Sequence, residues 1–134
     1  MVLGNEAHIN AVLKVKSNMD SGMFYGIQKG AIAALKSEQD WFDEFNTVYK
    51  KRQQLMFQLV EKLNCDYDKN AVGMFVWAKL PAGAASSEKF IDTILYDKSI
   101  FITPGTIFGS NGEGYIRFSL CVTEEKIKEA IGRF

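Results

Sequence analysis

The sequence has few of the residues from which metal sites and histidine-based catalytic systems are built. It contains one histidine, His8, and two cysteines, Cys65 and Cys121, among 134 residues. A structural zinc site takes about four His, Cys or carboxylate ligands, and an activated nucleophile needs a base beside it. The sequence therefore predicts no metal site and no histidine-based nucleophile, and we expect both cysteines to be free, packed thiols.

Net charge and long apolar runs are also lacking. Sixteen Lys and Arg balance sixteen Asp and Glu, so no net positive field attracts nucleic acid or an anionic membrane surface. No apolar run approaches the ~20 residues of a membrane helix. Residues 1–10 lack the basic and apolar regions of a signal peptide. We therefore expect a cytoplasmic protein that binds neither nucleic acid nor membranes.

Apolar and aromatic residues are plentiful. Hydrophobic residues make up 47% of the chain and aromatic residues 13%, enough to offset the entropy of ordering the backbone. A length of 134 residues suits one domain with a hydrophobic core.

Three helices are predicted in the first half of the chain. Asn5 can cap a helix that ends near Lys16, and the polar residues 17–22 read as a loop. A second helix from Phe24 to Leu35 contains two glycines, which suggests close packing against another surface. A third helix, from Glu38 to Leu63, would measure close to 40 Å at about 1.5 Å per residue, a length typical of a connection between two domains.

Short strands alternate with two further helices in the second half. We expect strands at 66–67, 73–80, 100–102 and 115–120, a turn at 103–105, a glycine-rich loop at 109–114, and helices capped by Ser86 or Ser87 and by Thr123. This order predicts an α/β fold in which helices cover a small mixed or antiparallel sheet.

Arg117 is the residue most suited to binding chemistry. Period-two geometry places Tyr115, Arg117 and Ser119 on one face of the last strand and apolar residues on the other. A guanidinium on a strand matches a carboxylate bidentately; the alternative is a surface arginine paired with an acid. The neighbouring glycine loop runs into a strand instead of a helix N-terminus, which favours a connecting loop over a phosphate cradle.

Two segments around Arg117 resemble a known signature. The stretches 102–109 (ITPGTIFG) and 112–120 (GEGYIRFSL) resemble the C-terminal signature of class I/II aminotransferases, which are fold type I enzymes that use pyridoxal phosphate (PLP). Residues 2–5, 20–22 and 73–75 are similar to further parts of the same family. The resemblance covers essentially the whole chain and is closest to the aspartate and LL-diaminopimelate aminotransferase branch.

The resemblance implies a role for several residues. It implies that Arg117 binds the α-carboxylate of an amino-acid substrate, with Phe108 and Gly73 near the same site. Residues Asp20, Ser21 and Tyr25 would lie near a homodimer interface and the neighbouring active site. The implied reaction transfers an amino group between an amino acid and a 2-oxo acid, with PLP as cofactor.

The family's Schiff-base lysine, which stands in a Ser-Lys motif, has no counterpart in these 134 residues. We therefore expect this chain alone to be inactive and to hold no PLP. Residues 1–36 are predicted to be a remnant of the large PLP-binding domain, and residues 37–134 the small C-terminal domain. The alternatives are a non-catalytic amino-acid-binding regulatory domain, a fragment of a related PLP lyase, and a protein-interaction fragment.

Overall fold

The computed structural model describes residues 1–134 and divides them into two compact units, Met1–Phe42 and Asp43–Phe134. The division falls inside helix α3, which spans Gln39–Lys62. The sequence places its boundary before this helix, and the assignment of residues 1–36 to a larger domain stays a prediction. None of the helices combines the length and apolar character needed to cross a membrane.

The first unit contains helices α1 (Glu6–Met19) and α2 (Tyr25–Leu35). The predicted cap is present, since the Asn5 side chain accepts a hydrogen bond from the Ala7 amide at 3.0 Å. The predicted loop from Ser17 is wrong at its start, because α1 continues to Met19. The side chains of Ser17 and Asn18 donate to the Lys14 carbonyl instead of forming a turn, which keeps both residues helical.

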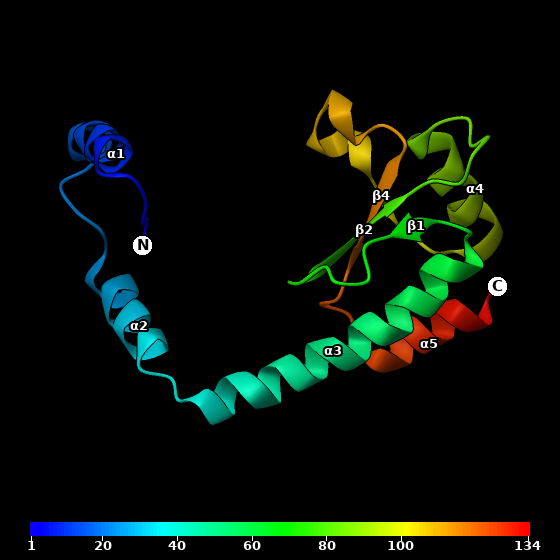
Figure 1. Ribbon diagram of the computed structural model, residues 1–134, viewed down its shortest axis with the longest axis horizontal. Helices are drawn as coiled ribbons and strands as arrows, with labels where there is room; N and C mark the ends of the chain where they lie inside the picture. The colour runs from blue at the N-terminus through cyan, green and yellow to red at the C-terminus, as the bar shows by residue number, and fades with distance from the viewer. The chain divides into compact units, whose positions relative to one another are not determined.

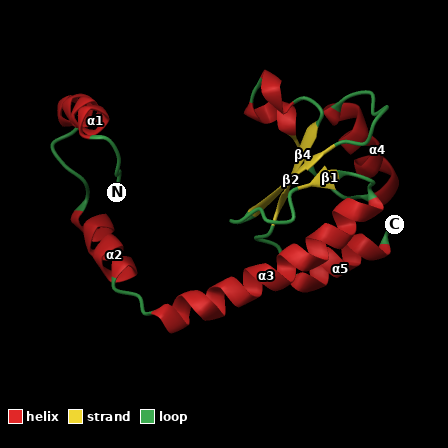
Figure 2. Ribbon diagram, viewed as in Figure 1, coloured by secondary structure: helices red, strands yellow, loops and turns green.

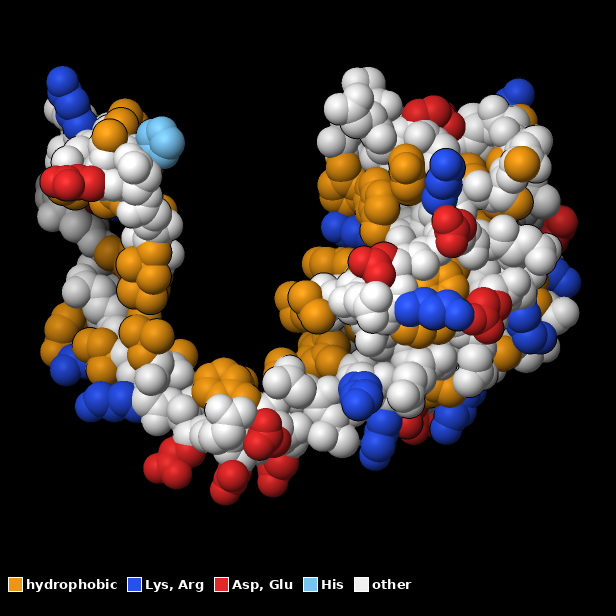
Figure 3. All heavy atoms as spheres, viewed as in Figure 1, with side chains coloured by type: hydrophobic (Ala, Val, Ile, Leu, Met, Phe, Trp, Pro, Cys, Tyr) orange, Lys and Arg blue, Asp and Glu red, His pale blue; other side chains and the backbone are white.

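Neither helix of this unit buries a residue. Phe24 is 76% exposed and Leu35 69% exposed, and hydrophobic side chains are visible over the surface of the unit (Figure 3). No other element is found packed on the glycines of α2: a Cβ at Gly30 would meet nothing within 4 Å, and the atoms nearest to one at Gly26 belong to the Phe24 ring.

The second unit is a four-stranded antiparallel sheet with helices (Figure 2). Its elements after α3 are β1 (Asp66–Tyr67), β2 (Phe75–Lys79), α4 (Ser87–Lys98), β3 (Thr103–Pro104), the 3-10 turns η1 (Gly105–Phe108) and η2 (Ser110–Gly112), β4 (Tyr115–Ser119) and α5 (Glu124–Gly132). The strand order is β1-β2-β4-β3. The predicted hairpin between β1 and β2 is confirmed, with Asp66 opposite Lys79.

One predicted strand is wrong. Residues 100–102 are not a strand, and the short strand β3 covers Thr103 and Pro104, where a turn was expected. Thr103 pairs with Arg117 and Pro104 with Ile116. Proline has no amide hydrogen to extend the ladder, and the chain turns directly afterwards into η1. Apolar β-branched residues favour a strand, but a strand also needs a partner alongside it.

The core lies on one face of the sheet, which α3, α4 and α5 cover (Figure 1). The inward strand positions alternate as expected, and buried residues of all three helices pack on them in a single cluster. The largest fully buried side chains are Ile116, Leu120, Ile127, Val60, Val76 and Ser87. The structure therefore confirms the predicted α/β fold with helices on a small sheet.

The two cysteines differ in environment. Cys65 is buried and Cys121 is exposed, and both are free, so the prediction of packing holds for Cys65 and is wrong for Cys121. Burial raises the pKa of the Cys65 thiol from 9.0 to about 11. The unfolded chain then ionises this thiol first as the pH rises, so its contribution to stability is complete below pH 9.0 and is lost between there and pH 11 or so.

We expect a thiol reagent at a pH of about 8 to label Cys121 in the folded protein and to spare Cys65, because the thiolate is the reactive form. Mass spectrometry of the labelled peptides measures the two rates. Cys121→Ser should remove the fast labelling. Equal rates at both cysteines in the folded chain would contradict the buried position of Cys65.

Candidate functional site

Arg117 occupies the middle of β4, with Trp77 of β2 opposite on one side and Thr103 of β3 on the other. Its neighbours along the strand, Ile116 and Phe118, are 0% and 5% exposed, whereas Arg117 is half-buried. The side chain therefore belongs to the sheet face that points away from the core, as the period-two pattern predicts.

Two aromatic rings hold the guanidinium of Arg117. Its central carbon Cζ lies 4.2 Å from the ring centroid of Phe75 in β2 and 4.4 Å from that of Phe108 in η1. Trp77 contacts the Phe108 ring edge to face at 5.7 Å and stacks on Tyr115 at 5.6 Å. Arg117 is thus set among aromatic side chains drawn from two strands and one turn.

The donors of this guanidinium are unused. No hydrogen bond or ion pair joins the Arg117 side chain to another group of the chain, and its Nε is buried without a partner. Ion pairs form elsewhere in the structure, at Lys16–Asp20, Lys126–Glu129 and Arg133–Glu129. Arg117 is therefore not a surface arginine paired with an acid, which was the alternative. An unpaired, partly desolvated cation is suited to binding an anion.

Gly73 stands two residues before Phe75, the residue of β2 whose ring contacts the Arg117 guanidinium. It has φ of +100°, in the loop before β2, where a side chain would be strained. It lines a cavity of about 230 Å³ between this loop and α3, together with Asn46 and Tyr49. Its conformation sets the entry into β2, and β2 carries Phe75 to the arginine.

The three residues predicted to lie near a dimer interface belong to the first unit. Asp20 pairs with Lys16 and accepts from the Gly22 amide; the hydrogen bond from Lys16 is the main cause that lowers the pKa of the Asp20 carboxyl. The Tyr25 ring lies 5.2 Å from the Lys29 ammonium, and Ser21 is exposed. Their role at an interface stays a prediction.

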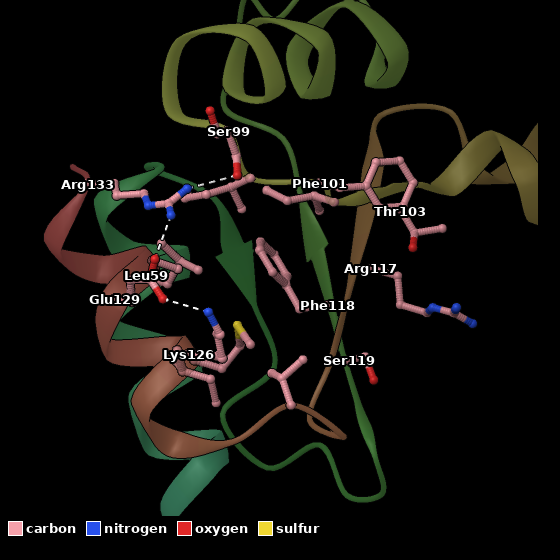
Figure 4. A pocket seen from close by; sticks show the side chains of 16 residues that line it. Leu59, Ser99, Phe101, Thr103, Arg117, Phe118, Ser119, Lys126, Glu129 and Arg133 are labelled. Carbon is pink, nitrogen blue, oxygen red and sulfur yellow. Dashed lines mark hydrogen bonds and ion pairs between the residues drawn. The ribbon is translucent and has the colours of Figure 1, made fainter.

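A cavity of about 380 Å³ lies between α3, α5, residues 100–103 and the end of β4. Arg117 belongs to its wall, but the guanidinium points away from the other lining residues (Figure 4). The charged groups on its rim are already bonded: Arg133 donates to the carbonyls of Lys98 and Ser99 and pairs with Glu129, which also pairs with Lys126. The cavity is therefore mainly apolar, and the charged side chains on its rim are not free to bind a ligand.

The glycine-rich loop is closed by its own backbone. Gly105 and Gly112 pack so tightly that a Cβ on either would overlap the carbonyl oxygen of the other. Glu113 accepts hydrogen bonds from the amides of Ser87 and Gly114, and Ser87 also accepts from Gly114. The glycines therefore allow two turns to pack closely and do not form an anion-binding site. This agrees with the expectation of a connecting loop.

Gly105 and Gly112 leave no room between them for the phosphate of PLP, because the backbone of each fills the space beside the other. No catalytic step of this chain is therefore assigned to the cofactor. The functional group of this site is the Arg117 guanidinium, which is suited to binding an anion.

Sequence reasoning missed the contacts that Phe75 and Trp77 make with the site. The available signal was the register: with β2 antiparallel to β4, period-two geometry places Phe75, Trp77 and Arg117 on one face. That register depends on pairing between distant segments, which a local pattern does not specify.

The fold is shared with aminotransferases of known structure. BacF from Bacillus subtilis superposes with a TM-score of 0.80 over 98% of this chain and 34% of its own, at 34% identity. An aminotransferase from Staphylococcus aureus gives a TM-score of 0.79 over 98% of this chain and 35% of its own, at 32% identity. The architecture is therefore that of the small domain of fold type I aminotransferases.

The sequence agrees over the same range. Residues 1–134 match the family described as "Aminotransferase class I and II", and the chain belongs to that family. The LL-diaminopimelate aminotransferase of Maridesulfovibrio salexigens is 39% identical over 133 residues, which cover 99% of this chain and 34% of the relative. That of Halothermothrix orenii is 38% identical over 98% of this chain and 33% of the relative. The chain thus spans about a third of the length of these relatives.

Proposed function

We propose that these 134 residues are the small-domain portion of a PLP-dependent aminotransferase, in which Arg117 anchors the α-carboxylate of the substrate. The observation that carries this proposal is a guanidinium that contacts two aromatic rings and uses none of its donors. The intact enzyme would move an amino group between an amino acid and a 2-oxo acid, and PLP would supply the electron sink for that chemistry.

The contribution of this chain is to bind and orient the substrate. Both carboxylate oxygens accept hydrogen bonds from one planar guanidinium, which fixes the direction in which the rest of the amino acid projects. Such orientation lowers the barrier, because the reacting atoms are held in place before the reaction begins. Phe108 borders this position through its contact with Arg117.

The Schiff-base lysine is proposed to come from outside these residues. No serine in the sequence is followed directly by a lysine, whereas the resembled motif has that pair. The 134-residue chain alone is therefore expected to give no transamination. The homodimeric state, with Asp20, Ser21 and Tyr25 near the interface, belongs to the same proposal.

The test is an assay of the full-length protein that carries these residues, supplied with PLP, an amino acid and a 2-oxo acid. We expect the donor to yield its 2-oxo acid and the acceptor to yield its amino acid in equal amounts. Release of ammonia without a new amino acid would favour the related PLP lyase instead. Saturable amino-acid binding by a protein without any turnover would favour the regulatory domain.

A further inference from the structure

The surroundings of Arg117 assign a task to the two rings that touch it. We propose that Phe75 and Phe108 are positioning residues, which fix the guanidinium so that a carboxylate is bound end-on through its two terminal nitrogens. This inference rests on the proposed function of Arg117 and adds how the binding group is held.

The two rings reach the guanidinium from different elements of the fold. Phe75 comes from β2 and Phe108 from η1, and each centroid lies within 4.4 Å of the guanidinium carbon. Cation–π contacts of this kind form within about 6 Å of the centroid and orient the cation as well as attract it. A long arginine side chain otherwise loses rotamer entropy when it binds a ligand. A guanidinium already held by two rings loses less.

The three nitrogens of the guanidinium differ in accessibility. The Nε atom is enclosed and has no partner, so a ligand has no access to the edge that contains it. The two terminal nitrogens are absent from the buried unpaired atoms, and neither makes a hydrogen bond. They are the donors left open, and together they match the two oxygens of a carboxylate.

The Phe108 ring is itself held by a neighbouring ring. Trp77 contacts the Phe108 ring edge to face at 5.7 Å, and Trp77 is the direct cross-strand partner of Arg117. Phe75 and Phe108 are 40% and 51% exposed, more than packing of the core requires. Large rings left half-exposed beside an unpaired cation are better explained by contact with that cation.

The experiment follows the Nε–H signal of Arg117 by NMR in the 134-residue chain during titration with acetate at constant ionic strength. Arg117→Lys assigns the signal. The variants are Phe75→Leu and Phe108→Leu, which keep apolar bulk without a ring, and Phe75→Tyr, which keeps the ring. Phe134→Leu is the matched control, because it removes a ring from Lys98 away from Arg117.

We expect the wild-type signal to be displaced by the two rings and acetate to bind. Each leucine variant should return the signal toward that of a free arginine and weaken acetate binding by roughly 3- to 30-fold. Phe75→Tyr and Phe134→Leu should both bind as the wild type does. Unchanged thermal midpoints are expected in all variants, since the rings are half-exposed.

Two other results are informative. Equal acetate binding by the wild type and both leucine variants would overturn the positioning role and leave Arg117 as the anchor. Failure of the wild type to bind acetate at Arg117 would contradict the proposed function itself, and the positioning role with it.

Discussion

Replacement of Arg117 by alanine in the intact enzyme should raise the Michaelis constant for every amino-acid donor by roughly 30- to 900-fold, corresponding to about 2 to 4 kcal/mol of lost binding. The reason is that the α-carboxylate is common to all donors, while the guanidinium makes no contact with their differing side chains in this account. Steady-state kinetics with several amino acids measures the effect. Arg117→Lys should recover part of the binding, because an ammonium keeps the charge and loses the bidentate geometry.

Arg133→Ala is the matched control for this prediction. Arg133 is an exposed arginine that bonds Glu129 and the carbonyls of Lys98 and Ser99, and it makes none of the ring contacts of Arg117. Its loss should leave the Michaelis constants unchanged. An Arg117→Ala enzyme with wild-type constants would remove the basis for an anchoring role.

Replacement of Gly112 by alanine should cost about 3 kcal/mol of folding free energy, near the upper end of the usual range for overpacking. The added Cβ would overlap the Gly105 carbonyl, and backbone atoms have no alternative rotamer through which to relieve the overlap. The two glycines join η1 to η2, and η1 carries Phe108, so the variant should also disturb the guanidinium of Arg117. Urea unfolding measures the change as a lower midpoint.

Gly132→Ala is the control, since a Cβ at Gly132 in α5 would meet nothing within 4 Å. Alanine is also favoured over glycine in helices by about 1 kcal/mol at most. We therefore expect an unchanged or slightly raised midpoint for this variant. Equal midpoints for the Gly112 and Gly132 variants would mean that the two turns do not pack as the structure has them.

Local signals in the sequence predicted local structure well. Ser86 caps α4 by accepting from the Lys89 amide, and Thr123 caps α5 by accepting from the Lys126 amide, both from residue type and position alone. Which of Ser86 and Ser87 caps the helix could be decided only from the folded structure. Ser87 is 0% exposed and accepts from the Gly114 amide, a partner 27 positions later in the chain.

The features that define the site depend on contacts between distant segments. The face that Arg117 occupies followed from its period, but its contacts with Phe75 and Phe108 required the β2–β4 register and the turn η1. The misplaced strand at residues 100–102 has the same origin, since pairing with β4 selects Thr103 and Pro104. Strand propensity is a property of one segment, whereas pairing with another strand determines which of several candidate segments becomes a strand.

The most direct test of the account compares an amino-acid donor with the amine that lacks only its carboxylate, in the wild-type and Arg117→Ala forms of the intact enzyme. The wild type should prefer the amino acid strongly in kcat/KM, since a site built to bond a carboxylate rejects an analogue that leaves its donors unpaired. The variant should lose most of that preference. A wild-type enzyme that uses both donors equally, or a preference that survives in Arg117→Ala, would show that the carboxylate is bound elsewhere.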